Sequence, residues 1–384
     1  MSELWVSLGT GEMLKVIRGI APILMGLFVV PGIGLAGDYS NQVWTYLAYE
    51  DSHPSQGPDF ARFNKLVQSP TPPIVTAPST KPISIVMVYP GKQVSDYWRR
   101  SQQSFEARMK QAGIDYTLDV LFTQAATDVR KQESFINRAL RKKPDYMVYT
   151  LDAIRHKTVV ERIIGRSSTK LILQNITTPL KAWEGSQPFL YVGFDHEIGS
   201  KMLAERYIEL TKGEGNYAVL FGPPGYVSEM RGDTFIQHVS KNSNLRLSAS
   251  YYVGFDRSRA KVATLDLVSQ STDLKFIYAA STDIALGAID ALRERNLLGK
   301  IMVNGWGGGS AELEALQNQD LDFTVMRMND DNGVAMADAI VLDRNGQTSS
   351  VPLIYSGEIV LITKDQNMDV LNDLKKQAFR YSDE

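Results

Sequence analysis

The chain contains no cysteine. This absence excludes disulfide bonds, thiolate nucleophiles and cysteine-based metal sites. Histidine is also scarce: the four histidines are His53, His156, His196 and His238, and they lack the spacing of metal ligands. We interpret them as surface or structural residues, and we expect neither a metal nor a cofactor.

An excess of charge of either sign is also absent. Forty-one Lys and Arg residues stand against 43 Asp and Glu residues, which gives a net charge of -2. Proteins that bind nucleic acid or an anionic membrane surface usually carry a basic patch. We therefore expect no nucleic-acid partner.

The first 36 residues have the pattern of a signal peptide. Lys15 and Arg18 precede the apolar stretch 19–30, and Gly34-Leu35-Ala36 offers small residues for cleavage after Ala36. We expect export to the periplasm and no direct membrane insertion after cleavage. The start codon stays open between Met1 and Met13.

A membrane anchor is the alternative for this segment, because the apolar stretch with its tail approaches the roughly 18 residues of a spanning helix. Two prolines, Pro22 and Pro31, and the small residues that follow disfavour a long helix here.

Residues 37–80 read as an N-terminal segment with a tether. Residues 37–66 are aromatic-rich and weakly patterned, and residues 67–82 are proline-rich, which predicts an extended connection.

From Lys81 onward, apolar runs typical of strands alternate with amphipathic stretches typical of helices. Strands are expected at 83–89, 116–122, 146–151, 170–174, 189–194, 217–221, 247–253, 276–280, 301–304, 323–328 and 353–362. Helices are expected at 95–112, 126–141, 154–164, 198–210, 228–239, 260–270, 284–295, 311–318 and 333–342.

This alternation predicts an α/β protein with two doubly wound parallel-sheet lobes, because near-continuous apolar strands between helices are buried on both faces. The expected first lobe comprises 81–194 plus 326–355, and the second comprises 195–325 plus 356–384. Several strands should form the hinge between the lobes.

Polar and aromatic residues follow three of the predicted strands. Gln93, Ser95 and Trp98 come after the first strand, Ser281, Thr282 and Asp283 after the strand at 276–280, and Trp306 with a glycine run after the strand at 301–304. In parallel α/β sheets small molecules bind beyond the carboxyl ends of the strands. We therefore predict one polar ligand held between these loops.

Each of these residues also has an ordinary structural interpretation. Ser95 and Asp283 are suitable helix caps, and Trp98 and Trp306 are suitable core residues. Arg231 and Arg327, viewed in the sequence alone, are typical solvated surface charges.

The run Asn304-Gly305-Trp306-Gly307-Gly308-Gly309-Ser310 lacks the Gly-Lys-Ser/Thr ending of a phosphate loop, so it does not support phosphate transfer. We expect its glycines to let the backbone approach a ligand, with the Trp306 ring as a flat apolar wall.

No catalytic set is visible in the sequence, since nothing couples a nucleophile to a base. We expect a protein that is not an enzyme. A secreted hydrolase working through Asp283 stays as an alternative, because Asp/Glu pairs are abundant.

Several segments together resemble the LuxP family of periplasmic autoinducer-2 receptors, which belongs to the ribose-type periplasmic binding proteins. The resemblance runs from about Lys81 to the C-terminus. It lies in residues 89–98, 171–179, 188–196, 231–235, 281–287, 304–314, 325–331 and 379–383.

The resemblance implies the type I periplasmic binding protein fold and a ligand pocket between the lobes. The ligand residues that it implies are Gln93, Ser95, Trp98, Asn175, Arg231, Thr282, Asp283, Trp306 and Arg327. The two tryptophans would wall the ring of the ligand, and the two arginines would neutralise it.

The ligand that the resemblance implies is autoinducer-2, a furanosyl borate diester and therefore an anion. It also implies a role in quorum-sensing signal transduction, in which the receptor regulates the periplasmic domain of a LuxQ-type sensor histidine kinase. The alternative with the same fold is a sugar-binding protein of a transport system. A neutral pentose would not need both Arg231 and Arg327.

Overall fold

The computed structural model describes residues 42–75, 81–125, 127–152 and 155–383. The predicted signal peptide, with its cleavage after Ala36 and the choice between Met1 and Met13, lies outside the described residues. Within the described ranges, the structure contains no helix that is both long enough and apolar enough to cross a membrane.

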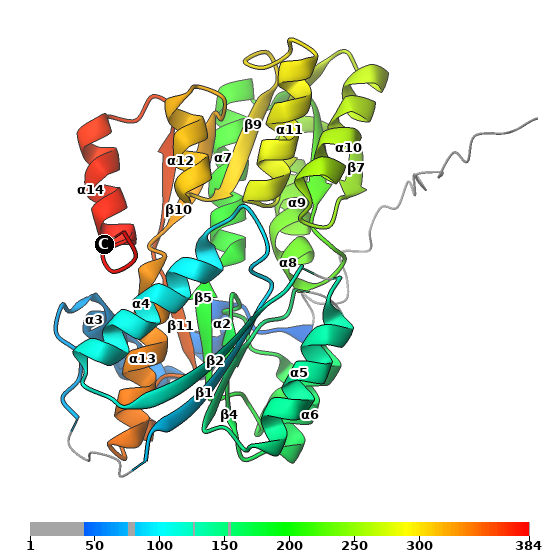
Figure 1. The fold of residues 1–384 in the computed structure, drawn as a ribbon. Coiled ribbons are helices and arrows are strands. Elements are labelled where there is room, and N and C mark those ends of the chain that lie inside the picture. The colour runs from blue at the N-terminus through cyan, green and yellow to red at the C-terminus, as the bar shows by residue number, and fades with distance from the viewer. Residues whose placement is uncertain (1–41, 76–80, 126, 153–154, 384) are drawn as a thin grey trace, which may run out of the picture. The chain divides into compact units, whose positions relative to one another are not determined.

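Each of two lobes is built on a six-stranded sheet (Figure 1). The first sheet has the order β11-β5-β4-β3-β1-β2, and its strands are paired in parallel. Its strands are β1 (Ile83–Tyr89), β2 (Tyr116–Phe122), β3 (Tyr146–Tyr149), β4 (Lys170–Gln174), β5 (Leu190–Phe194) and β11 (Ile354–Gly357).

The second sheet has the order β12-β10-β9-β8-β6-β7. Its strands are β6 (Glu214–Phe221), β7 (Asn244–Tyr252), β8 (Leu274–Ala279), β9 (Met302–Gly307), β10 (Phe323–Arg327) and β12 (Ile359–Thr363). All neighbours are parallel except β12, which is antiparallel to β10. The predicted fold class, two doubly wound and mostly parallel lobes, is confirmed.

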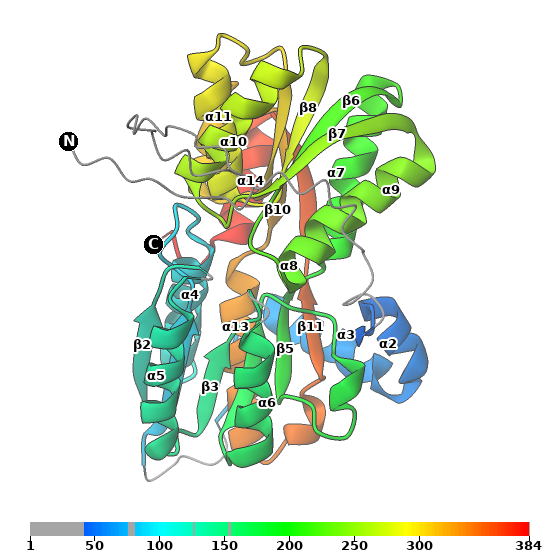
Figure 2. The same ribbon diagram turned by 90° about the vertical axis from the view of Figure 1, so that its right-hand side faces the viewer.

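Helices cover both faces of each sheet. In the first lobe, α5 (Val129–Arg141) and α6 (His156–Arg166) lie on one face, and α4 (Tyr97–Gln111) and α13 (Asp330–Arg344) on the other (Figures 1 and 2). In the second lobe, α10 (Arg257–Gln270) and α11 (Thr282–Glu294) lie opposite α7 (His196–Thr211) and α9 (Thr234–Asn242).

Burial on both faces explains the apolar strands. Met87, Val88 and Tyr89 of β1 have no exposed surface. Ile172 and Leu173 of β4 have none either. Such strands alternate with helices because a parallel connection needs a crossover long enough to return the chain to the same edge.

The chain passes between the lobes at three places: between β5 and α7, between β10 and α13, and between β11 and β12. The predicted lobe boundaries are therefore shifted. Met326 and Arg327 lie in the second sheet rather than the first, and Ser356 and Gly357 lie in the first rather than the second.

The predicted single strand at 353–362 is wrong. It is two strands in different sheets, β11 and β12, separated at Glu358. Ser356, Gly357 and Glu358 interrupt the apolar pattern of this segment at the point where the chain crosses between the sheets.

The segment before the first lobe is more regular than predicted. It forms α2 (Tyr46–Ser52) and α3 (Gly57–Gln68), and Phe60, Phe63 and Val67 of α3 are buried, where α3 packs against α13 and β11. The extended connection therefore starts at Ser69, after the helix, rather than at Val67.

The second lobe contains a helix that the sequence did not predict, α14 (Met368–Ala378). Its buried stripe is narrow, with Leu371 and Ala378 as its buried residues, which explains why the apolar pattern is weak. The remaining short elements are η1 (Pro54–Gln56), η2 (Lys181–Trp183), α8 (Tyr226–Ser228), the π-helical turn η3 (Glu229–Asp233), α12 (Ser310–Gln317) and η4 (Thr348–Ser350).

Candidate functional site

A cavity lies where the carboxyl ends of the strands of both lobes face one another. Its volume, as the space open to the centres of water-sized spheres, is about 40 Å³ in this arrangement of the lobes, and it is about 420 Å³ when the adjoining open solvent is included. Its lining residues are Pro90, Gln93, Ser95, Tyr97, Trp98, Asp152, Asn175, Val227, Arg231, Phe255, Ser281, Thr282, Trp306 and Arg327. This set includes every ligand residue predicted from the sequence except Asp283.

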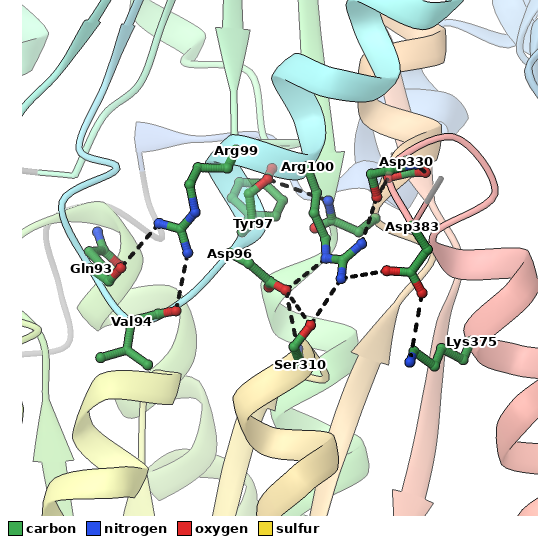
Figure 3. A network of polar contacts seen from close by, with 12 residues as sticks. Gln93, Val94, Asp96, Tyr97, Arg99, Arg100, Ser310, Asp330, Lys375 and Asp383 are labelled. Carbon is green, nitrogen blue, oxygen red and sulfur yellow. Dashed lines mark hydrogen bonds and ion pairs between the residues drawn. The ribbon is translucent and has the colours of Figure 1, made fainter.

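The first lobe contributes the loop between β1 and α4. Gln93 Nε2 donates a hydrogen bond to the Pro90 carbonyl at 2.6 Å, and Arg99 donates to the carbonyl of Gln93 at 3.2 Å (Figure 3). Ser95 is not the helix cap, because Asp96 occupies the N-cap position of α4. The loop therefore presents Ser95 to the cavity.

Trp98, in the first turn of α4, is 4% exposed and packs against Tyr89 and Tyr97 at ring-centroid distances of 5.0 and 4.7 Å. Trp98 is therefore both a core residue and a residue of the cavity wall. Its ring is part of the core of the first lobe and also lines the cavity.

Asn175 follows β4 in a left-handed backbone conformation, with φ 67°. Asparagine is one of the few non-glycine residues that adopts this region readily. Its side-chain oxygen lies 3.2 Å from Nε2 of His196, the first residue of α7 in the second lobe. Asn175 therefore stands at the boundary between the lobes.

Arg231 lies in the π-helical turn η3 and is 5% exposed. A single turn of π-helix is a frequent feature of functional sites. Its guanidinium lies 3.7 Å from the Trp306 ring centroid, and Nη1 donates to the Ala280 carbonyl at 2.8 Å. The interpretation of Arg231 as a solvated surface charge is wrong.

Arg327 ends β10 and is also 5% exposed. Its guanidinium lies 4.1 Å from the Tyr97 ring centroid and 5.9 Å from that of Trp306. In the described part of the chain, neither Arg231 nor Arg327 forms an ion pair with a carboxylate, and the Nε atom of each has no hydrogen-bond partner.

This arrangement is electrostatically costly without an anion. Burial, and then the charge of Arg327, lower the pKa of Arg231 to about 9. Burial also lowers the pKa of Arg327. Two desolvated guanidiniums with free N–H groups are what a compact anion requires for binding.

His196 is a residue of this region that the sequence did not single out. It is buried, and its ring lies 5.2 Å from that of Trp306 in an edge-on arrangement. Burial, followed by the charges of Arg231 and Arg327, holds its pKa well below the usual range. His196 is therefore a neutral, structural residue behind the cavity, in line with the structural role predicted for the histidines.

Asp283 does not line the cavity. Its carboxylate accepts hydrogen bonds from the backbone N–H groups of Val94 and Ser95 in the first lobe, at 2.9 and 3.2 Å. Burial raises its pKa, an effect that these hydrogen bonds oppose. Asp283 thus joins the lobes rather than facing a ligand, and its two oxygens are occupied.

The glycines of the run 304–310 are not among the residues that line the cavity, and the expectation that they let the backbone approach a ligand stays a prediction. They make room for protein atoms. A Cβ at Gly308 would lie 2.5 Å from the Cα of Met326, and one at Gly309 would lie 2.2 Å from a carboxylate oxygen of Asp96. Only Trp306 of this run reaches the cavity.

The sequence missed Tyr97, Asp152 and Phe255 as lining residues, whereas Ser281 lines the cavity, as its place after the strand at 276–280 predicts. Asp152 follows β3, and Nδ1 of His156 lies 2.5 Å from its carboxylate. The strand-end rule that identified Gln93, Ser281 and Thr282 would also have found Asp152, since it follows a strand of the predicted sheet. Among the described residues, no three His, Asp or Glu side chains gather in a way that could hold a metal ion.

The geometry agrees with comparisons to known proteins. Residues 85–348 match the family of periplasmic binding protein domains. The ribose import binding protein of Bacillus subtilis (strain 168) is 26% identical over 228 residues, which cover 58% of this chain and 70% of that protein. The D-allose-binding periplasmic protein of Escherichia coli (strain K12) is 25% identical over 149 residues, 38% of this chain and about half (48%) of that protein.

Solved structures share the fold. A periplasmic solute-binding protein of an ABC transporter from Actinobacillus succinogenes 130z with bound D-allose matches with a TM-score of 0.65 and 22% identity, covering 75% of this chain and all (100%) of that one. A glucose-galactose binding protein from Geobacillus stearothermophilus matches with a TM-score of 0.66 and 20% identity, covering 75% and 99%. At these identities the likeness concerns the fold alone.

Proposed function

The chain belongs to the family of periplasmic binding protein domains, and on this premise we propose that it is an extracytoplasmic, non-enzymatic receptor whose two lobes close on a small, sugar-like anion. The anion that fits the resemblance in the sequence is autoinducer-2 as its furanosyl borate diester. Its role would be quorum sensing rather than transport.

The observation that carries this proposal is the pair of buried arginines. Arg231 and Arg327 both line the cavity, both are 5% exposed, and neither has an acidic partner among the described residues. A tetrahedral borate would supply the missing negative charge and several acceptor oxygens. The rings of Trp98 and Trp306 give the cavity apolar walls for a furanose, and Gln93, Ser95, Asn175 and Thr282 supply polar groups for its hydroxyls.

A hydrolase working through Asp283 is not supported. Asp283 does not line the cavity, and its carboxylate contacts the backbone of Val94 and Ser95 instead of facing the space where a substrate would bind. The curated relatives reported above are binding proteins by their names.

A sugar-binding protein of a transport system is the second candidate. It is favoured by the relatives, whose names specify ribose and D-allose. The two candidates differ in the charge of the ligand, because a neutral sugar would leave both guanidiniums without a counter-ion, at a cost of several kcal/mol.

Signalling through a LuxQ-type sensor histidine kinase is the finer part of the proposal. Arg231 and Trp306 belong to the second lobe, while Trp98 and Gln93 belong to the first. A ligand that touches both lobes favours the closed arrangement by its differential affinity for that state. The kinase would detect this closure.

Two measurements test the proposal. The mature protein, purified from cells that produce autoinducer-2, is denatured, and the released small molecule and its boron content are identified by mass spectrometry and elemental analysis. Calorimetric titration then compares autoinducer-2 with and without borate against D-ribose and D-allose. We expect borate-dependent binding. Tight binding of a neutral sugar, with no effect of borate, would replace the proposal by the transport candidate.

A further inference from the structure

Glu312 is a buried carboxylate that lies behind the cavity rather than in its wall. It belongs to the first turn of α12 and has no exposed surface. It does not line the cavity. A negative side chain near a helix N-terminus is favoured by the helix dipole, but that alone does not explain complete burial.

Its two oxygens hold the backbone at the end of β9, which carries Trp306, and at the start of the loop that follows β9. Oε1 accepts a hydrogen bond from the backbone N–H of Trp306 at 3.0 Å, and Oε2 accepts one from the backbone N–H of Gly308 at 2.8 Å. Oε2 also accepts from the Thr324 hydroxyl at 2.5 Å. All the partners are donors, which is the pattern that a carboxylate requires.

The loop has little freedom to move away from Glu312. A Cβ at Gly305 would lie 2.4 Å from Oε2 of Glu312, so a side chain at this position would displace the carboxylate. The Trp306 ring is also confined by Gly199 of α7, because a Cβ at this position would lie 2.9 Å from the ring. The backbone hydrogen bonds of Glu312 therefore fix where the ring stands.

The Trp306 ring in turn supports the arginine pair. Its centroid lies 3.7 Å from the Arg231 guanidinium and 5.9 Å from that of Arg327. A shift of the loop would move this ring off Arg231 and change the wall of the cavity.

The charge of Glu312 acts on the same pair. It raises the pKa of Arg231 and that of Arg327, against the larger lowering by burial. Glu312 is thus a fixed negative charge close enough to favour the charged forms of both arginines without occupying the space where an anion binds.

From the hydrogen bonds to Trp306 and Gly308 and the complete burial of its carboxylate, we propose that Glu312 is a positioning residue of the binding site. It holds the Trp306 ring against Arg231 and so fixes the wall that an anionic ligand would contact beside the two arginines. The second half of this statement rests on the proposed function, whereas the first half does not.

Three variants separate these two roles. Glu312→Gln keeps the size of the side chain but removes the charge and turns one acceptor into a donor that faces a backbone N–H. Glu312→Asp keeps the charge but shortens the reach to the loop. Glu314→Gln is the matched control, since Glu314 lies in the same helix and is exposed.

The first readout needs no ligand. In protein labelled with ¹⁵N-tryptophan, the indole signal of Trp306 is identified by its absence from the Trp306→Phe spectrum. We expect this signal to shift or broaden in both Glu312 variants and to stay unchanged in Glu314→Gln. An unchanged signal in folded Glu312→Gln protein would overturn the positioning role.

The second readout is the pH profile of binding, with autoinducer-2 in borate buffer as the probe. Loss of the charge lowers the pKa of Arg231 further, so the alkaline loss of binding should begin at lower pH in Glu312→Gln than in the unchanged protein or Glu312→Asp. Affinity near neutral pH should fall about tenfold or more in Glu312→Gln. Equal profiles and affinities would overturn a role of Glu312 in ligand binding.

Thr324→Val provides a milder test in case Glu312→Gln does not fold. It removes one donor to Glu312 and leaves its charge in place. We expect a smaller change of the Trp306 signal, and an unchanged signal would contradict the proposal. If the unchanged protein binds no autoinducer-2, the proposed function fails, yet the Trp306 signal of the free protein still decides the role of Glu312.

Discussion

The carboxylate of Asp283 in the second lobe accepts a hydrogen bond from the backbone N–H of Val94 in the first lobe, at 2.9 Å. This contact is one of several that join the lobes beside the cavity. Asp96 accepts hydrogen bonds from the Ser310 hydroxyl at 2.8 Å and from Arg100 Nε at 2.7 Å (Figure 3). The structure thus represents the lobes in a closed arrangement, with the loop of Gln93 tied to the start of α11.

Loss of the Asp283 contact should favour opening of the lobes. In Asp283→Ala the N–H groups of Val94 and Ser95 lose a charged acceptor, which costs about 1.5–3 kcal/mol for hydrogen bonds of this kind. We expect weaker ligand binding and a larger radius of gyration by small-angle scattering. Asp290→Ala is the control, because Asp290 lies in the same helix and pairs with Arg257 at the surface. Equal dimensions and affinity in Asp283→Ala would show that this contact does not control closure.

Arg231 and Arg327 should lower the stability of the free protein and strengthen its binding of an anion. Replacing Arg231 or Arg327 by Met removes one of two buried like charges, so the free protein should unfold at the same or a higher temperature. Affinity for the anion should fall by about 2–5 kcal/mol. Thermal unfolding and calorimetry measure the two effects, and Arg246→Met, on the exposed surface of β7, is the control. Unchanged affinity in both single variants would remove the anion from the proposal.

Binding should weaken at alkaline pH. Because burial and Arg327 lower the pKa of Arg231 to about 9, its charge is lost as the pH rises through that value. In the unfolded chain the pKa is higher, so the unfolded state holds more protons above pH 9. The contribution of Arg231 to the stability of the free protein should therefore rise with pH above about 9, while its contribution to binding falls. Comparison of pH titrations with those of Arg231→Met isolates both effects.

Tryptophan fluorescence should report ligand binding through Trp98 and Trp306. Both rings line the cavity, from opposite lobes. We expect the ligand-induced change to be largely lost in the Trp98→Phe, Trp306→Phe double variant. Trp183→Phe is the control, since Trp183 is buried elsewhere in the first lobe and donates to Glu161. A full response in the double variant would mean that the ligand does not contact these rings.

The C-terminal residues should stabilise the arrangement of the lobes. After α14, Arg380 forms an ion pair with Asp331, and Asp383 forms one with Arg100 at 2.7 Å (Figure 3). Truncation after Phe379 removes the Arg380 partner of Asp331 and the Tyr381 and Ser382 donors of Asp330, both buried in α13, which costs about 3–5 kcal/mol. We expect a lower unfolding temperature and a more open protein by small-angle scattering. Truncation after Asp383 is the control, and equal behaviour of the two truncations would exclude a role for this segment.

Much of the fold could be predicted from the sequence because burial on both faces of a parallel sheet leaves a clear mark. The bounds of β1, β2 and β4 agree with the prediction residue for residue. The division at Glu358 was not predicted, although Ser356, Gly357 and Glu358 interrupt the apolar pattern there, because a break of three residues is also compatible with a single irregular strand. The sequence interpretation also missed α3, which buries Phe60, Phe63 and Val67, and α14, which buries Leu371 and Ala378.

The chemistry of the candidate site was also partly visible. Residue type and position at strand ends identified Gln93, Ser95, Trp98, Thr282 and Trp306, all of which line the cavity. Arg231, Arg327 and Asn175 entered only through the resemblance to a known family. Their ligand-binding roles stay predictions.

The sequence by itself determined which residue types stand at the ends of which strands, because local periodicity and turn chemistry depend on neighbours along the chain. Only the tertiary structure decided what each of these side chains contacts. Asp283 meets Val94 rather than the cavity, Arg231 is buried against Trp306, and Glu312 holds the loop beside them. These relationships join residues from separate elements, and burial, charge pairing and hydrogen bonding between them exist only once the sheets are packed together.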